Sequence, residues 1–533
     1  MIEHNQAPKS PAALPLMLSV FVVATCGLVY ELVAGALASY LLGDSITQFS
    51  TVIGVYLFAM GVGSYLSRFV TSDPLTLFVK VELFVGLLGG FSSTLLFFVF
   101  SYGVAFPVAL YSLVFLIGAG VGLEIPLLMN VLHGEMPFKD LVSRVLSFDY
   151  IGALVASVAF PIVLLPHLGL IRTALLFGIC NVAVSLVMAV VYQRSRPSMR
   201  ITKWFASAIL AGMVAAFVFG DALLETAEAA IYPEPVIHAT STPYQRVVLT
   251  RSRYSLRLYL NGHLQFDSTD EYRYHESLVH VAASFAKQRK RVLILGGGDG
   301  MAAREVFRYP DVESVTLVDL DPGVTSLFRG SVVLSALNGN SLANPKLKVV
   351  NQDAFVWLRN YGESLDDDAT ANGSSSTELF DLIIIDFPDP TNFSLGKLYT
   401  TTFYKSVKKV LSNSGVMVVQ STSPLMARKS FWCVERTIKE SGLVTKPFHA
   451  YVPSFGEWGY ILAAKSDETF RSDLGGTGAF PPVIQGARFI TDATLPSLFD
   501  FPPDMSPVEV ETNRLNSQDL VHYYEQEWGR YGM

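Results

Sequence analysis

The sequence predicts a multi-span α-helical membrane domain, followed by a small β element and a doubly wound α/β domain. Hydrophobic residues make up 51% of the 533 residues and charged residues only 16%, a balance that favours membrane spans over an ordinary soluble protein. The apolar runs are confined to the chain before about residue 220. Beyond that point, apolar β-branched segments alternate with helical patterns, as in a parallel sheet covered by helices.

Five segments follow from these changes of pattern. They are a membrane domain at 1–220, an acidic linker at 221–243, a small β-hairpin element at 244–268, a Rossmann-like domain at 269–465 and a C-terminal tail at 466–533. The net charge of −7 argues against a nucleic-acid partner, which would need a clustered basic surface. The three cysteines are widely scattered, and they predict neither a disulfide framework nor a metal site.

The membrane domain is expected to contain about seven helices. Its apolar stretches lie at 14–40, 50–70, 76–100, 104–132, 147–166, 171–192 and 203–220. Each is close to the ~20 residues that a bilayer requires. The lipid bilayer is therefore an expected partner, and a multi-pass protein of the cell (inner) membrane is the expected location.

The loop charges predict an orientation for these spans. Lysine and arginine are concentrated in alternate loops, beginning with the N-terminal segment. By the positive-inside rule, the N-terminus then lies in the cytoplasm. With seven spans, the C-terminal domain would face away from the cytoplasm.

Five ionisable side chains fall within the predicted spans. They are Glu31, Lys80, Glu82, Glu124 and Asp149. Charges inside a membrane are costly and often functional, so a polar pathway or a site for a cationic ligand is one interpretation. The alternative is that some of them, Lys80 and Asp149 above all, lie at the membrane interface.

The remaining chain predicts a mostly parallel sheet. Short antiparallel strands come first, and Asn261-Gly262 has the residues of a type I′ hairpin turn. Further strands are expected at RVLIL, SVTLVDLD, LKVV, FDLIIID and VMVVQ, which begin at residues 291, 314, 347, 380 and 416. Helical stretches separate these strands, which indicates a doubly wound, Rossmann-like domain of the methyltransferase type.

A glycine-rich loop in LILGGGDGMAARE (293–305) carries an unexpected acid. Such loops usually hold phosphate on bare N–H groups, but Asp299 would repel a phosphate. Other acids also stand at strand ends: Asp319, Asp321, Asp353, Asp386 and Asp389. The carboxyl ends of parallel strands meet at one edge, so these acids favour an adenosine-type ligand that carries a sulfonium or ammonium cation. Asp319 is placed to bind a ribose diol.

No metal site is expected at the two histidines of the predicted first helix of this domain. His275 and His280 are five residues apart in an HExxxH pattern, whereas zinc-binding HExxH places two histidines on one helical face.

Motifs across about 240–465 resemble those of the polyamine aminopropyltransferases (spermidine synthases). They are the Tyr244-Gln245 pair, LNGHLQ (260–265), DEYRYHE (270–276), GGGDG (296–300) with Arg304-Glu305, VDLD (318–321), QDA (352–354), DFPDP (386–390) and LYTTTFY (398–404). Several motifs in the same order make the resemblance specific. The apolar half before this domain and the tail after it resemble the membrane-bound bacterial branch of the family.

The resemblance implies transfer of an aminopropyl group from decarboxylated S-adenosylmethionine to an amine, typically putrescine, with release of methylthioadenosine. It implies a co-substrate and no tightly bound cofactor, and a homo-oligomer is compatible with it. Because this family's donor is made in the cytoplasm, the resemblance favours a cytoplasmic catalytic domain, which conflicts with the loop charges.

The resemblance also assigns residue roles. Asp386 would be the general base, with Tyr274 assisting it, because an alkylammonium must lose a proton before it can attack. The amine-binding residues would be His275, Asp299, Asp386 and Asp389. The donor-binding residues would be Gln245, Gln265, Asp299, Asp319, Asp353 and Ala354.

Departures from the family pattern bear on the acceptor amine. Phe387-Pro388 replaces small polar residues, Phe455 stands where a tyrosine is usual, and Thr422 replaces an acid. Two other functions are open: an S-adenosylmethionine-dependent methyltransferase, and a polyamine transporter or sensor with a binding domain. The carboxylate of intact S-adenosylmethionine would lie close to Asp299, a like charge, which disfavours the methyltransferase.

Overall fold

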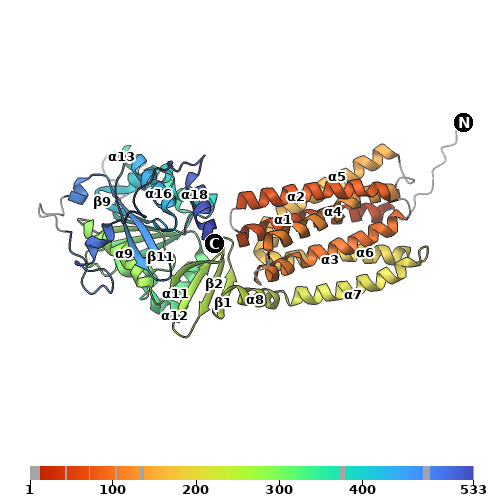
Figure 1. Cartoon of the computed structure of the whole chain (residues 1–533), viewed down its shortest axis with the longest axis horizontal. Coiled ribbons are helices and arrows are strands. Elements are labelled where there is room, and N and C mark those ends of the chain that lie inside the picture. Colours follow the sequence, from red (N-terminus) through yellow and green to blue (C-terminus); the bar gives the residue numbers. More distant parts are fainter. Residues whose placement is uncertain are drawn as a thin grey trace. The chain divides into compact units, whose positions relative to one another are not determined.

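The computed structural model describes residues 13–42, 45–70, 73–101, 105–132, 137–370, 379–471 and 480–531 (Figure 1). The chain divides into two compact units, Met1–Val236 and Ile237–Met533. The first is helical and the second holds both β-sheets.

The helical unit has eight α-helices among its described residues. They are α1 (Ala13–Leu42), α2 (Ser45–Leu66), α3 (Pro74–Ser101), α4 (Phe106–Leu132), α5 (Phe138–Ala159), α6 (Leu165–Tyr192), α7 (Ser198–Val218) and α8 (Gly220–Ile231). Each of the seven predicted apolar stretches overlaps one of α1–α7. The helices bury a common apolar core, to which α1, α3 and α4 contribute many side chains.

By length and composition alone, six helical runs of the described chain could cross a membrane. The count is six because α5, a short π-helix (Phe160–Leu164) and α6 form one continuous run, Phe138–Tyr192, of 55 residues. That run is far longer than the ~20 residues that span a bilayer. Gly169, with a φ of +68°, breaks it between the predicted apolar stretches 147–166 and 171–192.

The predicted linker is in fact structured. Helix α8 and strand β1 (Val236–Ser241) occupy most of 221–243, so the small β element begins before residue 244. It is a four-stranded sheet, not a hairpin, in the order β1-β2-β3-β4, with β2 at Arg246–Arg251, β3 at Leu256–Leu260 and β4 at His263–Asp267. A turn from Thr242 N–H to the Gln245 carbonyl (2.9 Å) brings β1 beside β2, a pairing that local pattern does not reveal.

The predicted hairpin turn at Asn261-Gly262 is confirmed. Both residues have a positive φ, +50° and +83°, as a type I′ turn requires. The turn joins β3 to β4 and so fixes the register of this sheet.

The second sheet has seven strands in the order β10-β11-β9-β8-β5-β6-β7. The strands are β5 (Arg291–Gly296), β6 (Ser314–Asp319), β7 (Leu347–Asn351), β8 (Phe380–Asp386), β9 (Leu411–Gln420), β10 (Val444–Val452) and β11 (Gly456–Ala464). Strands β5–β9 pair in parallel, and all five were predicted. The antiparallel strands β10 and β11 extend the β9 edge. This is the Rossmann-like sheet expected from the sequence.

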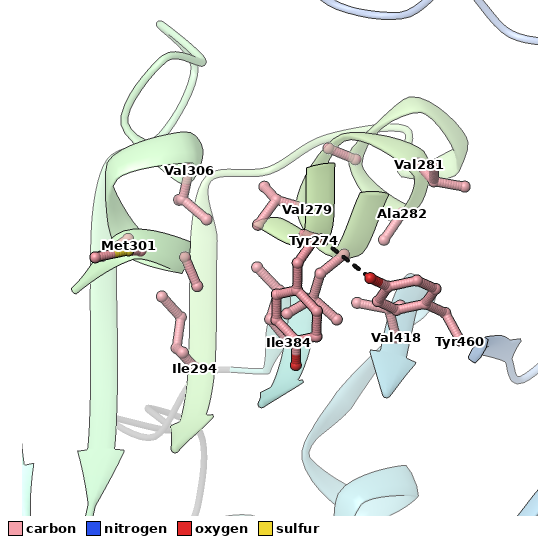
Figure 2. Close-up of a cluster of buried hydrophobic side chains, with 14 of the residues drawn as sticks. Tyr274, Val279, Val281, Ala282, Ile294, Met301, Val306, Ile384, Val418 and Tyr460 are labelled. Atoms are coloured by element: carbon pink, nitrogen blue, oxygen red, sulfur yellow. Dashed lines mark hydrogen bonds between the residues drawn. The ribbon is translucent and has the colours of Figure 1, made fainter. Parts of the chain in front are cut away.

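Helices cover both faces of this sheet. They are α9 (Glu271–Phe285), α10 (Met301–Val306), α11 (Pro322–Gly330), α12 (Val332–Leu337), α13 (Ala354–Thr370), α14 (Phe393–Gly396), α15 (Thr401–Val410), α16 (Arg428–Glu440), α17 (Glu468–Arg471) and α18 (Asp519–Trp528). Ile294 and Ile384 enter the core that also contains side chains of α9 and α10 (Figure 2). Because side chains alternate along a strand, Leu293 and Ile383 enter the core on the other face of the sheet.

The C-terminal tail is part of this domain. The buried Glu276 carboxylate of α9 accepts the N–H groups of Arg488, Phe489 and Ile490 at 2.7–3.2 Å. Leu520 of α18 is fully buried in the core on the other face of the sheet. The amphipathic pattern near the end of the chain therefore reflects a helix docked on the domain.

Candidate active site

The carboxyl ends of the central strands bring the predicted acids to one edge of the sheet. In the register of β5 and β8, Gly296 lies opposite Asp386. Gly296 has a φ of +83°, and a Cβ there would lie 2.1 Å from the Asp386 carbonyl oxygen. Only glycine allows this approach, so the glycine-rich loop is held directly against the end of β8.

Asp386 is paired with Tyr274. The Tyr274 hydroxyl, from α9, donates a 2.6 Å hydrogen bond to Asp386 Oδ1. Burial raises the pKa of Asp386 to about 6; the charge of Asp299 also raises it, while His275 and the Tyr274 hydrogen bond lower it. The Tyr274 carbonyl accepts a 3.4 Å hydrogen bond from the hydroxyl of Tyr460, so α9 is tied to the sheet at this point (Figure 2).

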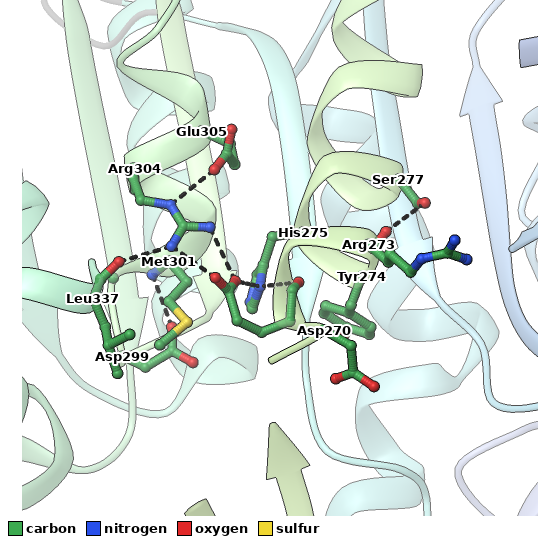
Figure 3. A network of polar contacts seen from close by, with 12 residues as sticks. Asp270, Arg273, Tyr274, His275, Ser277, Asp299, Met301, Arg304, Glu305 and Leu337 are labelled. Atoms are coloured by element: carbon green, nitrogen blue, oxygen red, sulfur yellow. Dashed lines mark hydrogen bonds and ion pairs between the residues drawn. The ribbon is translucent and has the colours of Figure 1, made fainter. Parts of the chain in front are cut away.

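An ionic network fixes His275, the residue that follows Tyr274 in α9 (Figure 3). His275 Nδ1 lies 2.8 Å from Glu271 Oε2, and Arg304 donates two hydrogen bonds to the same carboxylate at 2.9 and 3.0 Å. Burial alone would lower the pKa of His275, but Glu271, Asp299 and Asp386 raise it to about 9. His275 is therefore an imidazolium at neutral pH, and its cation stabilises the nearby carboxylates.

Asp299 lies in the loop between β5 and α10. Its Oδ1 accepts the Met301 N–H at 2.9 Å, and its carbonyl oxygen accepts from the Asn338 side chain at 2.8 Å. These bonds fix its place in the glycine-rich loop, and Figure 3 shows the one between Asp299 and Met301. Asp299 also acts electrostatically on both His275 and Asp386, so the predicted acid of the loop does join the predicted base.

The predicted ribose ligand, Asp319, ends β6. Its carboxylate accepts the N–H groups of Gly298 (3.1 Å) and Asp321 (2.9 Å). Burial raises its pKa to about 6. Gln245 comes to the same strand end, but its side chain donates to Asp321 at 2.8 Å, so in this structure its amide supports the loop after β6.

Asp353 and Ala354 form the start of α13. Asp353 Oδ1 caps this helix by accepting the N–H of Phe355 at 2.8 Å, and Oδ2 pairs with Lys397 Nζ at 2.6 Å. Burial raises the pKa of Asp353, but the Lys397 and backbone hydrogen bonds outweigh it, so the pKa is lowered. Gln265 instead donates to the carbonyl of His263 in its own strand, a contact that does not join it to the other predicted residues.

Asp389 accepts hydrogen bonds from three side chains, of which the sequence analysis named Thr422 and missed Gln420 and Tyr524. Gln420 Nε2 donates to Oδ1 at 3.2 Å, Thr422 Oγ1 donates to Oδ2 at 2.9 Å, and the Tyr524 hydroxyl also bonds the carboxylate. Burial nevertheless raises the pKa of Asp389 to about 6. The carboxylate is therefore ionised above that pH and held in one orientation.

Two departures from the family pattern acquire a structural meaning here. Thr422, where the family has an acid, donates to Asp389 and accepts from Trp528 Nε1 at 3.3 Å. Phe455, where a tyrosine is usual, packs on Tyr274 with ring centroids 6.1 Å apart. The acid is thus replaced by a donor, and the phenol by an apolar ring.

The structure therefore joins four predicted residues, Tyr274, His275, Asp299 and Asp386, and places Asp389 three positions beyond Asp386. The tail supplies Tyr524 and Trp528 from α18, 135 or more positions after Asp389. The one sequence signal for them is the amphipathic pattern of this segment, which indicates docking but not its target.

Comparison with known proteins identifies similar chains. A family model described as spermine/spermidine synthase domain matches residues 271–473. The polyamine aminopropyltransferase of Leptospira interrogans is 48% identical over 515 residues, covering 97% of this chain and 99% of the relative. Polyamine aminopropyltransferase 2 of Ralstonia nicotianae is 49% identical over 525 residues, covering 96% and 98%. A solved spermidine synthase from Thermotoga maritima is 23% identical with a TM-score of 0.43, covering 55% of this chain and 88% of that one.

Proposed function

The chain belongs to the polyamine aminopropyltransferase (spermidine synthase) family, and on this basis we propose its acceptor, its products and the residues that act. The reaction is transfer of an aminopropyl group to an amine, with decarboxylated S-adenosylmethionine as co-substrate and no tightly bound cofactor. We propose putrescine as the acceptor, so that the products are spermidine and methylthioadenosine. The supporting observation is a half-buried carboxylate, Asp386, at the end of β8, with a second half-buried carboxylate, Asp389, three positions after it.

Asp386 acts as the general base in this proposal. A putrescine ammonium group donates a proton to Asp386 as attack begins, because the protonated nitrogen has no lone pair with which to attack carbon. The nitrogen then forms a bond to the aminopropyl carbon next to the sulfonium. The carbon–sulfur bond breaks, and its electron pair stays on sulfur, which leaves as the neutral thioether of methylthioadenosine. Since this leaving group needs no acid, the protein's main task is in-line positioning.

Asp389 binds the distant ammonium of the diamine. Gln420, Thr422 and Tyr524 hold this carboxylate in place, and burial strengthens its attraction for a cation. His275, as an imidazolium, is better suited to stabilise Asp386 and Asp299 than to contact an ammonium. We propose that it reaches the amine only through these acids.

Asp299 selects the donor. A decarboxylated donor presents an ammonium, which this acid attracts, whereas intact S-adenosylmethionine presents a carboxylate, which it repels. Asp319 binds the ribose hydroxyls, and Asp353 and Ala354 contact the adenine of the donor. Gln245 supports this site through Asp321, and Gln265 reaches the donor only after leaving its contact with the His263 carbonyl.

A donor and acceptor panel tests this function. The purified full chain is incubated with decarboxylated or intact S-adenosylmethionine and with putrescine, cadaverine or spermidine, and products are identified by mass. We expect methylthioadenosine and spermidine from the decarboxylated donor with putrescine. A methylated product from the intact donor would favour the methyltransferase instead, and turnover of another amine alone would replace putrescine as acceptor.

The pH profile tests the role of Tyr274. In the wild type, kcat/KM for putrescine is expected to fall as pH drops through about 6, because Asp386 becomes protonated. Tyr274→Phe removes a hydrogen bond that lowers this pKa, so the acid limb should move to higher pH by about one unit. The loss of kcat/KM in Tyr274→Phe should therefore be largest near pH 6 and smaller at pH 8.

Tyr460→Phe is the matched control for this profile. It removes a hydroxyl that donates to the Tyr274 carbonyl and not to the acid. Its acid limb should coincide with that of the wild type. An unshifted limb in Tyr274→Phe would show that this hydroxyl does not tune the base.

We also propose that the helical unit is embedded in the cell membrane, with the catalytic unit on the cytoplasmic side where its donor is made. Support comes from the six long apolar runs and from the many large apolar side chains, such as Phe58, Tyr150 and Trp204, that lie exposed on these helices. With seven spans, the distribution of lysine and arginine among the loops predicts the opposite side of the membrane for this unit.

A further inference from the structure

Four helices of the N-terminal unit each bury a polar side chain that has no hydrogen-bond partner among the described residues. The atoms are both carboxylate oxygens of Glu82 in α3, Oε1 of Glu124 in α4, both amide atoms of Asn181 in α6 and the hydroxyl of Tyr30 in α1. All four side chains are at most 2% exposed. A buried polar group without a hydrogen-bond partner destabilises the fold, and a carboxylate does so most. We therefore expect these four side chains to bind a ligand.

Asn181 faces the stretch of α3 that carries Glu82. The Ser185 hydroxyl of α6 donates to the Val79 carbonyl of α3 at 2.9 Å, which fixes the register of the two helices. A Cβ on Gly86, one turn after Glu82, would lie 2.9 Å from the Asn181 Cβ. Asn181 therefore lies on α6 at the level of the Glu82–Gly86 turn.

Helices α4 and α1 approach the same stretch of α3. A Cβ on Gly120, one turn before Glu124, would lie 2.4 Å from a Val85 methyl group. A Cβ on Gly89 would lie 2.6 Å from the Tyr30 ring. Glu82 and Glu124 interact electrostatically with each other and with Tyr30. Helices α1, α4 and α6, which carry the other unpaired groups, thus all pack on the Glu82–Gly89 stretch of α3.

The described part of the chain supplies no positive charge that would balance these acids. Among the described residues, no arginine, lysine or histidine pairs with Glu82 or Glu124, and Lys80 of α3 is exposed. Carboxylate, amide and hydroxyl oxygens are the usual ligands of hard metal ions, and they also accept hydrogen bonds from ammonium groups. A Cβ at Gly86, Gly89 or Gly120 would overlap a neighbouring helix, and this close packing favours a small ion over a bulky one.

We propose that Glu82, Glu124, Asn181 and Tyr30 form a binding site for one compact monovalent cation, an alkali-metal ion or a primary ammonium group. The site lies within the helical unit and does not depend on the proposed transfer reaction. Sites at the middle of a helical bundle, built from several helices, are typical of proteins that bind or move ions in membranes.

Thermal unfolding of the detergent-solubilised full chain tests the site. Ionic strength is held constant with N-methyl-D-glucamine chloride, a bulky cation, which is replaced stepwise by NaCl, KCl or methylammonium chloride. We expect at least one of these salts to raise Tm by about 3–8 °C near 100 times its Kd, and above Kd the rise should follow the logarithm of the salt concentration. The salt that acts distinguishes a metal ion from an ammonium group.

Glu82→Gln and Glu124→Gln are each expected to weaken this cation dependence at least tenfold, while aminopropyl transfer is kept. Glu31→Gln, the same change at another glutamate of the unit that lies outside the unpaired set, should keep the full shift. If a variant does not fold, isothermal titration of the same salts into the wild type decides the question. The absence of saturable binding by all three cations, or an equal loss in Glu31→Gln, would overturn the proposal.

Discussion

Asp386→Asn is expected to lower kcat with putrescine by about 10²–10⁴-fold, the usual contribution of a positioned general base. An asparagine keeps the size of the side chain and can still accept from Tyr274, but its amide cannot take up the ammonium proton. Steady-state kinetics at pH 8 measure the effect. There the wild-type acid, with its pKa of about 6, is ionised, so the whole loss is attributable to the missing base.

Asp381→Asn is the matched control because it makes the same change at the opposite end of β8. The Asp381 carboxylate accepts from Gln288 and from the Arg291 N–H, away from the site. This variant should have a lower Tm and an unchanged kcat. Equal kcat values for Asp386→Asn and the wild type would remove Asp386 from the reaction, whereas equal losses in both variants would indicate a general folding defect.

Asp389→Asn is expected to raise KM for putrescine by about 30-fold to several thousand-fold, because losing one partner of a buried charge pair costs about 2–5 kcal/mol. The change falls on binding and not on proton transfer, so kcat should change much less than KM. Initial rates over a range of putrescine concentrations separate the two constants.

Tyr524→Phe should also raise KM for putrescine, but by a smaller factor than Asp389→Asn does. It removes one of three donors to Asp389, worth about 1–2 kcal/mol, so KM should rise about 5–30-fold. Butylamine, which lacks the second ammonium, is the control acceptor, and both variants should use it as the wild type does. A KM for butylamine that rises as much as that for putrescine would show that Asp389 does not bind the distant ammonium.

Much of the catalytic unit was predictable because its signals are local. The apolar runs of β5–β9 identify buried parallel strands, and parallel strands place the residues after them at one edge. Asp299, Asp319 and Asp386 were therefore assigned to one site from their positions alone. The acid in the glycine-rich loop also indicated a cationic ligand, since its charge is independent of the fold.

Tertiary packing decided the rest. Local sequence patterns do not predict which distant segments come into contact. They therefore could not give the pairing of β1 with β2, the docking of α18 or the contact of Tyr524 with Asp389. The raised pKa of Asp386 and the imidazolium state of His275 also follow from burial and neighbouring charges, which exist only after folding. The sequence alone thus predicted the parallel sheet and the acids at its edge, because strand pattern and charge are properties of short segments, and its motifs indicated the reaction class through their resemblance to a family. The structure decided which donors orient those acids and which polar groups of the helical unit meet, because proximity and desolvation arise only when distant segments pack together.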